Sequence, residues 1–384
     1  MHRNNLLLLF ILLGICFSCI KPFEPEIKKI AAVKYVVMGL ITDQEGYQTI
    51  TVSKTSPLSA PAYIPVTSCA VTIHDSRGNH FTATETGSGK YNVLIAREYL
   101  QPGTAYSVQV ELPDGSQITS GSDTMPAGPA IDSIYFERKD LGTSTPGELN
   151  KGIQFLIDLE GAETDSRYYR WEITETWEYH AKYPVEWYYD GEVRQTVPPD
   201  NSRRICWRTM PVQTIFTLST KKLSGNRFKA MPLHFVNNKS SRLEYLYSLL
   251  VRQIALSEDG YRYWDQIRAN TSIGEGLYEQ QPIMVKGNLQ NITNPEQEVL
   301  GYFGASVVRS KRIFVQNVPD LPLESTDVCS VTFLKEGFQG ISPKDYPGYL
   351  RSENGKPTMD LLSNDCVDCL LQGGTNVKPD FWPN

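Results

Sequence analysis

The chain has 384 residues, with 37 lysines and arginines against 43 aspartates and glutamates, which gives a net charge of −6. This length predicts about two or three domains. An acidic chain without a basic cluster argues against nucleic acid as a partner, because phosphate binding needs clustered positive charge. Its 40% hydrophobic residues argue against a disordered or fibrous chain, and its 21 tyrosines, 28 glycines and 24 prolines favour strands and turns.

The first 18 residues predict a lipoprotein signal peptide. An uninterrupted apolar run extends from Leu6 to Leu13 and continues to Phe17, which is too short for a spanning helix of about 20 residues. Ser18 provides a small residue directly before Cys19. A cysteine in the first mature position resembles the bacterial lipobox, in which the thiol is acylated. We therefore expect Cys19 to carry lipid.

Residues 19–32 form the expected tether behind the lipid. Each buried acyl CH₂ adds about 0.8 kcal/mol of membrane binding, so a multiply acylated Cys19 anchors durably. Lys21, Glu24 and Glu26 in this tether are reminiscent of signals that send some Bacteroidota lipoproteins to the cell surface. We expect an outer-membrane, surface-exposed lipoprotein. The sequence leaves undecided whether the body faces outward or towards the periplasm. The alternative is an ordinary secretory signal with an incidental cysteine.

Residues 33–125 predict an immunoglobulin-like β-sandwich. Short segments in which apolar and polar residues alternate are typical of half-buried strands. Turns rich in Gly, Pro, Asp and Asn separate these segments. Seven strands at this spacing fit an immunoglobulin-like fold; they are expected at 34–41, 49–53, 70–74, 80–85, 91–95, 106–110 and 117–119.

A larger β-rich domain is predicted over residues 132–318, after a linker rich in Pro and Gly. Within it, residues 169–179 alternate and predict a long half-buried strand, in which Glu175 is an acid on the aromatic face. Ser257 predicts the N-cap of a helix that extends to about residue 269. We expect residues 319–384 to form long loops that their cysteines hold in place. Further strands are expected at 132–136, 153–157, 212–218, 246–254, 283–289 and 306–315.

Five cysteines follow Cys19, and an exported chain favours disulfides between them. Cys366 and Cys369 form a CxxC pair, but neither a thioredoxin-type strand–helix context nor a second zinc-ligand pair accompanies it. We expect each of the two to pair with a distant cysteine, with Cys206 and Cys329 as the candidates. An odd number leaves at least one thiol free or paired outside the chain.

An aromatic hairpin is the candidate contact surface. Trp187 and Tyr188 precede Asp190-Gly191, which is a two-residue hairpin signal. Tyr183 and Tyr188 are expected to be exposed there, and aromatic side chains with a polar tip are common in protein and sugar recognition. The alternative is that the aromatic residues of this region belong to the core.

Catalysis is not expected, and neither is a metal or another cofactor. The sequence has no Gly-x-Ser-x-Gly elbow and no His-Glu-x-x-His helix. A glycosidase-like carboxyl pair stays open, because its spacing exists only in three dimensions. Glu172, Glu175 and Glu178 flank aromatic residues, as in sugar sites, but a solvated strand face explains Glu172 and Glu178 equally well.

Several short motifs together resemble one family, the Bacteroidota lipoproteins with domain of unknown function 4249. The resemblance covers nearly the whole mature chain, and the order of the motifs with the carboxy-terminal block makes it specific. After the lipobox, the motifs lie at 20–23, 35–42, 132–134, 206–207, 256–264, 287–288, 301–306, 366–369 and 373–382.

This resemblance implies an accessory or lid subunit of a TonB-dependent outer-membrane transporter in nutrient uptake. It implies no catalytic residues; the body would sit over or beside a β-barrel and hold a peptide or glycan, or gate access. Tethering raises the effective concentration of such a lid at its partner. The first alternative is an adhesin or envelope scaffold, and the second, ranked below it, is a glycan-directed hydrolase.

Overall fold

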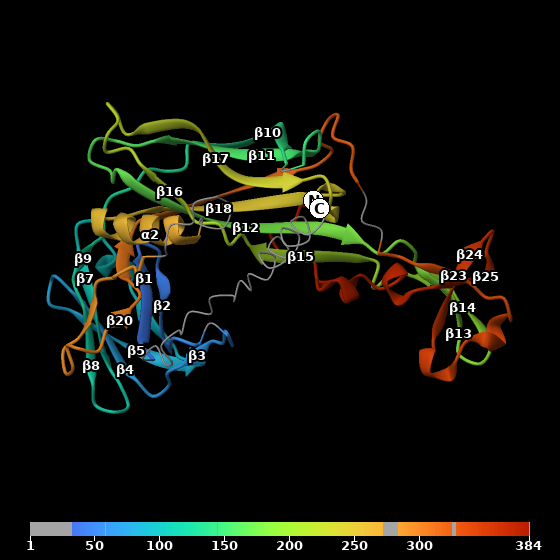
Figure 1. The fold of residues 1–384 in the computed structure, drawn as a ribbon, viewed down its shortest axis with the longest axis horizontal. Helices are drawn as coiled ribbons and strands as arrows, with labels where there is room; N and C mark the ends of the chain where they lie inside the picture. Colours follow the sequence, from blue (N-terminus) through green and yellow to red (C-terminus); the bar gives the residue numbers. More distant parts are fainter. Residues whose placement is uncertain (1–32, 58, 144, 272–282, 325–327, 384) are drawn as a thin grey trace, which may run out of the picture.

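The computed structural model describes residues 33–57, 59–143, 145–271, 283–324 and 328–383. A large first sheet lies below a central pair of smaller sheets in the view of Figure 1, and a small sheet projects at the far end of the long axis. One α-helix occurs in the described ranges. The protein is therefore mainly β, as the composition predicts.

The first sheet is nearly closed. Nine strands follow one another along its hydrogen-bonded path, and three further strands pair off that path. All seven strands predicted between residues 33 and 125 are present in it. The path order is β19 (Leu289–Asn291), β8 (Gln117–Ser120), β7 (Ala105–Glu111), β4 (Ala70–Asp75), β5 (His80–Gly87), β6 (Lys90–Ile95), β2 (Gly46–Lys54), β1 (Tyr35–Thr42) and β20 (Val299–Leu300), with β3 (Ile64–Pro65), β9 (Asp123–Thr124) and β21 (Phe303–Ser306) beside it.

Residues 289–306 return to the first sheet from far along the chain. β20 and β21 pair in parallel with β1, and β19 pairs with β8. These residues were expected in the main domain, whereas their backbone completes the first sheet. Gly301 permits this close approach, because a Cβ there would lie 2.0 Å from the carbonyl oxygen of Val37 and its φ is +103°.

Two antiparallel sheets form the centre of the molecule. The long strand predicted at 169–179 is β12 (Tyr168–His180), and its odd-numbered residues from Tyr169 to Tyr179 are buried as predicted. The rings of Phe155 and Tyr247 stack between the two sheets. The first has the order β15 (Ile205–Pro211), β12, β18 (Tyr247–Ala255), β22 (Val308–Val315), with β16 (Phe216–Ser219) on β12; the second is β10 (Ser133–Gly142), β11 (Leu149–Glu160), β17 (Arg227–Asn237).

Three strand predictions in this region need correction. The strand predicted at 306–315 is divided between β21 and β22, because the chain crosses from the first sheet to the central sheet at Val307. The strand predicted at 212–218 is confined to β16, which begins at Phe216. Residues 283–288 form no strand, and β19 begins at Leu289. Apolar runs do not reveal where a chain changes sheets.

The predicted helix is α2 (Glu258–Thr271). Its amino end is capped as predicted, since the backbone N–H of Gly260 donates to Ser257 Oγ at 3.0 Å. Glu258 and Asp259 place negative charge in the first turn, which favours the positive end of the helix dipole. The helix packs on β12 and β16, beside the first sheet (Figure 1).

The projecting sheet corrects the prediction of a loop-rich carboxy-terminal segment. Three strands after residue 319 join the predicted hairpin in one five-stranded sheet. The hairpin loop has three residues rather than two, because Tyr189 pairs with Val193. The sheet order is β14 (Val193–Asp200), β13 (Val185–Tyr189), β24 (Gly348–Glu353), β25 (Lys356–Leu362), β23 (Val331–Phe333). Short 3-10 helices lie at Phe338–Gly340, Pro343–Asp345, Asn364–Cys366 and Cys369–Gln372, and earlier at Arg97–Tyr99 and Ser241–Leu243.

Two disulfides hold the carboxy-terminal segment. Cys206 on β15 is bonded to Cys369, and Cys329 is bonded to Cys366. Each cysteine of the CxxC pair thus has a distant partner. Cys69, directly before β4, is free and half-buried. The first bond joins residues 163 positions apart, so it restricts a long loop in the unfolded chain.

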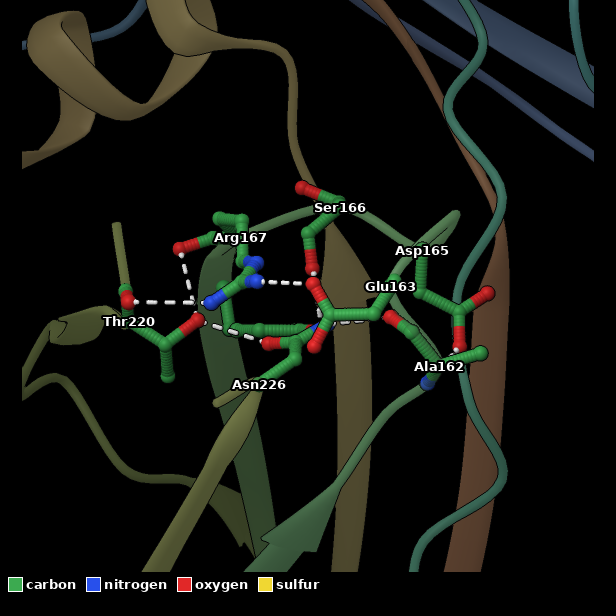
Figure 2. Close-up of polar contacts among 8 residues, drawn as sticks. Ala162, Glu163, Asp165, Ser166, Arg167, Thr220 and Asn226 are labelled. Atoms are coloured by element: carbon green, nitrogen blue, oxygen red, sulfur yellow. Dashed lines mark hydrogen bonds and ion pairs between the residues drawn. The ribbon is translucent and has the colours of Figure 1, made fainter. Parts of the chain in front are cut away.

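A buried amide organises the start of β12 (Figure 2). Asn226 is 2% exposed, and its Nδ2 donates to the carbonyl oxygens of Ala162 and Ser166 at 3.1 and 3.0 Å. The hydroxyl of Thr220 donates to Asn226 Oδ1 at 2.6 Å. One side chain thereby joins the loop before β12, the turn after β16 and the beginning of β17.

We expect Asn226→Ala to destabilise the fold by about 2–4 kcal/mol, because it removes three hydrogen bonds of one buried side chain, to the carbonyls of Ala162 and Ser166 and from the Thr220 hydroxyl. The midpoint of urea unfolding measures this loss. Asn201→Ala is the matched control, since Asn201 is exposed and its amide donates only to a nearby carbonyl; a change within about 0.5 kcal/mol is expected. Equal effects of both substitutions would contradict the role of Asn226.

Candidate functional site

The candidate site is a cleft of about 550 Å³ between the first sheet and the central sheet. Strands β1, β2 and β21 form one side, and β12, β18 and α2 form the other. This volume lies in the range of small-molecule sites. The residues that line it include Gly39, Leu40, Thr42, Glu45, Tyr47, Gln48, Asp123, Arg170, Glu172, Arg252, Trp264, Tyr302 and Ser306.

An arginine–glutamate–arginine cluster lies on the central-sheet side. Arg170 and Glu172 are two residues apart on β12 and therefore share a face; Arg170 Nη2 donates to Glu172 Oε1 at 2.7 Å. Arg252 is the direct cross-strand neighbour of Glu172 on β18, and its Nη1 donates to Glu172 Oε2 at 2.6 Å. Two guanidinium groups thus share one carboxylate.

Arg170 is only 7% exposed. Its contacts with Glu172 and Trp264 hold the guanidinium group in place. Its guanidinium carbon lies 3.8 Å from the ring centroid of Trp264 on α2, within the range of a cation–π contact. Burial lowers the pKa of the Arg170 guanidinium, and the charge of Glu172 opposes that effect. Arginine stays protonated in proteins, so a fixed positive charge faces the cleft.

The lining of the cleft also includes a buried carboxyl group. Asp123 is 6% exposed, and the backbone N–H of Ala305 donates to its Oδ2 at 2.9 Å. Burial raises the pKa of Asp123, although hydrogen bonds from Ser257 and the Ala305 backbone work in the opposite direction. Asp123 therefore joins β9 to β21 and to the beginning of α2.

The first sheet supplies the rim. The Gln48 side chain fixes the turn after β1, because its Oε1 accepts from the backbone of Thr42 at 3.0 Å and its Nε2 donates to the carbonyl of Gln44 at 2.8 Å. Next to it, Tyr47 is 71% exposed and pairs across the strands with Leu94, which is also exposed. An aromatic ring thus stands at the entrance.

The aromatic residues of the predicted contact surface lie in or beside the projecting sheet. Trp187 and Tyr188 are on β13, and Tyr183 precedes that strand. All three are half-buried rather than exposed. Trp187 packs against the cluster of Tyr189, Ile341 and Leu350, and Tyr183 packs beside the Cys329–Cys366 region, because the strands from the carboxy-terminal segment cover the hairpin. Cys19 lies outside the described residues.

The three glutamates considered above as a sugar site, Glu172, Glu175 and Glu178, have different hydrogen-bond partners. Glu175 is buried, and it accepts from Tyr247 at 3.0 Å and from Arg242 at 3.2 Å. Glu178 Oε1 lies 2.7 Å from His180 Nε2, and its Oε2 accepts from Trp382 at 3.1 Å. Of the three, only Glu172 lines the cleft described above.

The sequence reasoning did not identify Arg170, Arg252 and Trp264 as site residues. Arg170 and Glu172 were assigned to the polar face of β12, and Trp264 to the packed face of a helix. The only available signal was a pair of opposite charges two residues apart, which is common on solvated strands. Arg252 is 80 residues from Glu172 along the chain, so its pairing depends on the strand order.

Among the described residues, no three His, Cys, Asp or Glu side chains gather where they could hold a metal ion. Nor does any helix in the described ranges have the length and apolar character needed to cross a membrane.

Comparison with known protein families identifies the family of this chain. The model for the domain of unknown function DUF4249 matches residues 20–312, which is well over half of the sequence, and the chain therefore belongs to the DUF4249 family. The match includes the first sheet, α2 and every residue named above for the cleft, and it ends before Cys329. A search of curated proteins finds no match.

Asp123→Asn tests the buried carboxyl group. Because the folded-state pKa of Asp123 is raised above its ordinary value of 3.8, its contribution to stability is complete below that value and is lost as the pH rises through the folded pKa. The variant cannot ionise, so we expect its unfolding free energy to rise relative to the unmodified protein from about pH 4 to about pH 7.

Urea unfolding at several pH values measures this difference. Asp114→Asn is the control: the Ser116 N–H donates to the exposed Asp114 carboxylate at 2.9 Å and lowers its pKa, so the contribution of Asp114 changes only as the pH falls below about 4, and the difference between that variant and the unmodified protein should stay constant from about pH 4 to about pH 7. A pH-independent difference for Asp123→Asn would refute the buried, ionisation-resistant carboxyl group.

Proposed function

We propose that this protein is a non-catalytic outer-membrane lipoprotein of the bacterial cell surface that serves as an accessory or lid subunit of a TonB-dependent transporter in nutrient uptake. Lipid on Cys19 anchors it, and residues 19–32 tether the body. Membership of the DUF4249 family supports this proposal through the Bacteroidota lipoproteins that the motifs resemble.

The observation that carries the proposal is the cleft at the junction of the two large sheets. A subunit that holds a solute needs a concave site of small-molecule size with a few fixed polar groups. The cleft has that size, and Arg170 is fixed there by Trp264 and Glu172. A glycan-directed hydrolase is less well supported, because Glu172 is already paired with two guanidinium groups.

The finer fold and domain assignments belong to the same proposal. We infer that residues 33–125 form an immunoglobulin-like sandwich, which β19, β20 and β21 from residues 289–306 complete, with the rest of residues 132–318 as the main domain and 319–384 as the carboxy-terminal segment. Pairing of non-consecutive strands, β4 with β7 and β2 with β6, supports two facing layers.

An adhesin or envelope scaffold is the second candidate, and the projecting sheet favours it. This sheet extends away from the body (Figure 1). Its edge strand β23 is exposed along its whole length, with Phe333 at 64%. Exposed apolar side chains on a sheet edge are typical of contact sites. A transporter partner and another surface protein would both find this region accessible.

Labelling with radioactive palmitate tests the anchor. We expect the unmodified protein to incorporate label and to fractionate with membranes, and Cys19→Ala to lose both properties, because the acyl chains on Cys19 are the anchor. Cys16→Ala is the matched control and should label normally. A Cys19→Ala protein that still labels and remains with membranes would rule out this anchor.

A pull-down from detergent-solubilised outer membranes, read by mass spectrometry, tests the partner. A TonB-dependent β-barrel is expected in about equimolar amount, because an accessory subunit forms a specific complex. Tyr188→Ala should reduce its recovery if β13 contributes to the contact, whereas substitution of Tyr63, an exposed tyrosine directly before β3, by alanine should not. Recovery of other surface proteins without a barrel would favour the adhesin instead.

A further inference from the structure

The arginine–glutamate–arginine cluster in the cleft has more hydrogen-bond donors than acceptors. Each guanidinium group carries five N–H donors, and Glu172 accepts one bond from each arginine. Within the part of the chain that the structure describes, Arg170 Nε is a buried donor without a partner. Buried polar groups nearly always have a hydrogen-bond partner. The cluster therefore has donor groups to which a ligand could supply acceptors.

The charge of the cluster points the same way. Two arginines and one glutamate leave one net positive charge on the central-sheet side of the cleft. Asp123 opposes it weakly, because burial raises the pKa of that carboxyl group and favours its neutral form. Glu45 is on the exposed rim, where solvent screens its charge. An anion inside the cleft therefore gains net attraction.

A ligand can reach this charge without a rearrangement. Arg252 and Glu172 are partly exposed, and both line the cleft. Arg170 is already fixed against Trp264, so little side-chain freedom is lost on binding. The Ser306 hydroxyl also lines the cleft and is likewise buried without a partner among the described residues.

We propose that the cleft binds a small solute through a carboxylate group, which pairs with Arg252 and is stabilised by the charge of Arg170. This inference rests on the proposed role of the cleft as a solute site and names its substrate class. Planar guanidinium groups match carboxylates better than they match neutral hydroxyl groups. An acidic sugar and an acidic peptide share this chemistry.

Calorimetric titration of the purified full-length protein in detergent tests the proposal. The probes are digalacturonic acid and the blocked dipeptide N-acetyl-Glu-Glu-amide, each compared with its neutral counterpart, digalactose and N-acetyl-Gln-Gln-amide. At least one acidic probe should bind about tenfold or more tightly than its counterpart, because it adds charge-assisted hydrogen bonds. Its affinity should fall as salt is added. The probe that binds identifies the source of the carboxylate.

Two substitutions separate a binding role from a structural one. Arg252→Gln should weaken binding of the acidic probe about tenfold or more. Glu172→Gln removes the internal competitor and should strengthen it, which a merely structural cluster would not do. Arg262→Gln is the matched control, because Arg262 is an exposed arginine on α2 that pairs with Asp259 outside the cleft; it should leave binding unchanged. Melting curves verify that each variant is folded.

Failure of both acidic probes to bind, or unchanged binding by folded Arg252→Gln, would overturn the proposal. The pull-down of a β-barrel reports the proposed function independently. A barrel partner without carboxylate binding therefore rejects the substrate class alone, and carboxylate binding without a barrel rejects the accessory role alone.

Discussion

The return of residues 289–306 to the first sheet is the constraint on which the rest of the structure depends. β21 pairs in parallel with β1, and the chain then passes through Val307 directly into β22 of the central sheet. The two large sheets are therefore joined by continuous, hydrogen-bonded backbone. Gly301 and Gly287 allow the approach, since a Cβ on Gly287 would lie 1.5 Å from the carbonyl oxygen of Gly301. The cleft exists because this junction fixes both of its walls.

The charged cluster at that junction is costly to bury and is positioned accordingly. A guanidinium group loses much hydration when it is as enclosed as Arg170, and it is tolerated only with good partners. Glu172 and the Trp264 ring provide them from β12 and α2. The arrangement depends on strand register, because a slip of one residue between β12 and β18 would move Arg252 to the opposite face from Glu172.

Local sequence patterns predicted the local structure well, but they did not predict which strands pair with each other. Alternation located β12 and the strands of the first sheet, and Ser257 marked the start of α2. Periodicity carries no information about partners, so residues 289–306 were placed in the main domain and residues 319–384 were expected to be loops, whereas they contribute β19 to β21 to the first sheet and β23 to β25 to the projecting sheet. The cleft could not be predicted for the same reason: Arg170 and Arg252 become neighbours of one carboxylate only through the order of β12 and β18.

The two ends of the molecule are stabilised by different means. The projecting sheet has two small buried clusters, one of Tyr189, Ile341 and Leu350 and one of Leu362, Cys366 and Val367; burial on this scale offsets little of the entropy of ordering five strands. The two disulfides supply covalent restraint there. The cleft lies instead between two well-packed sheets, and a solute in it would contact both. Binding to the folded state alone adds stability through mass action, so occupancy of the cleft would strengthen the junction between the sheets and leave the projecting sheet unaffected.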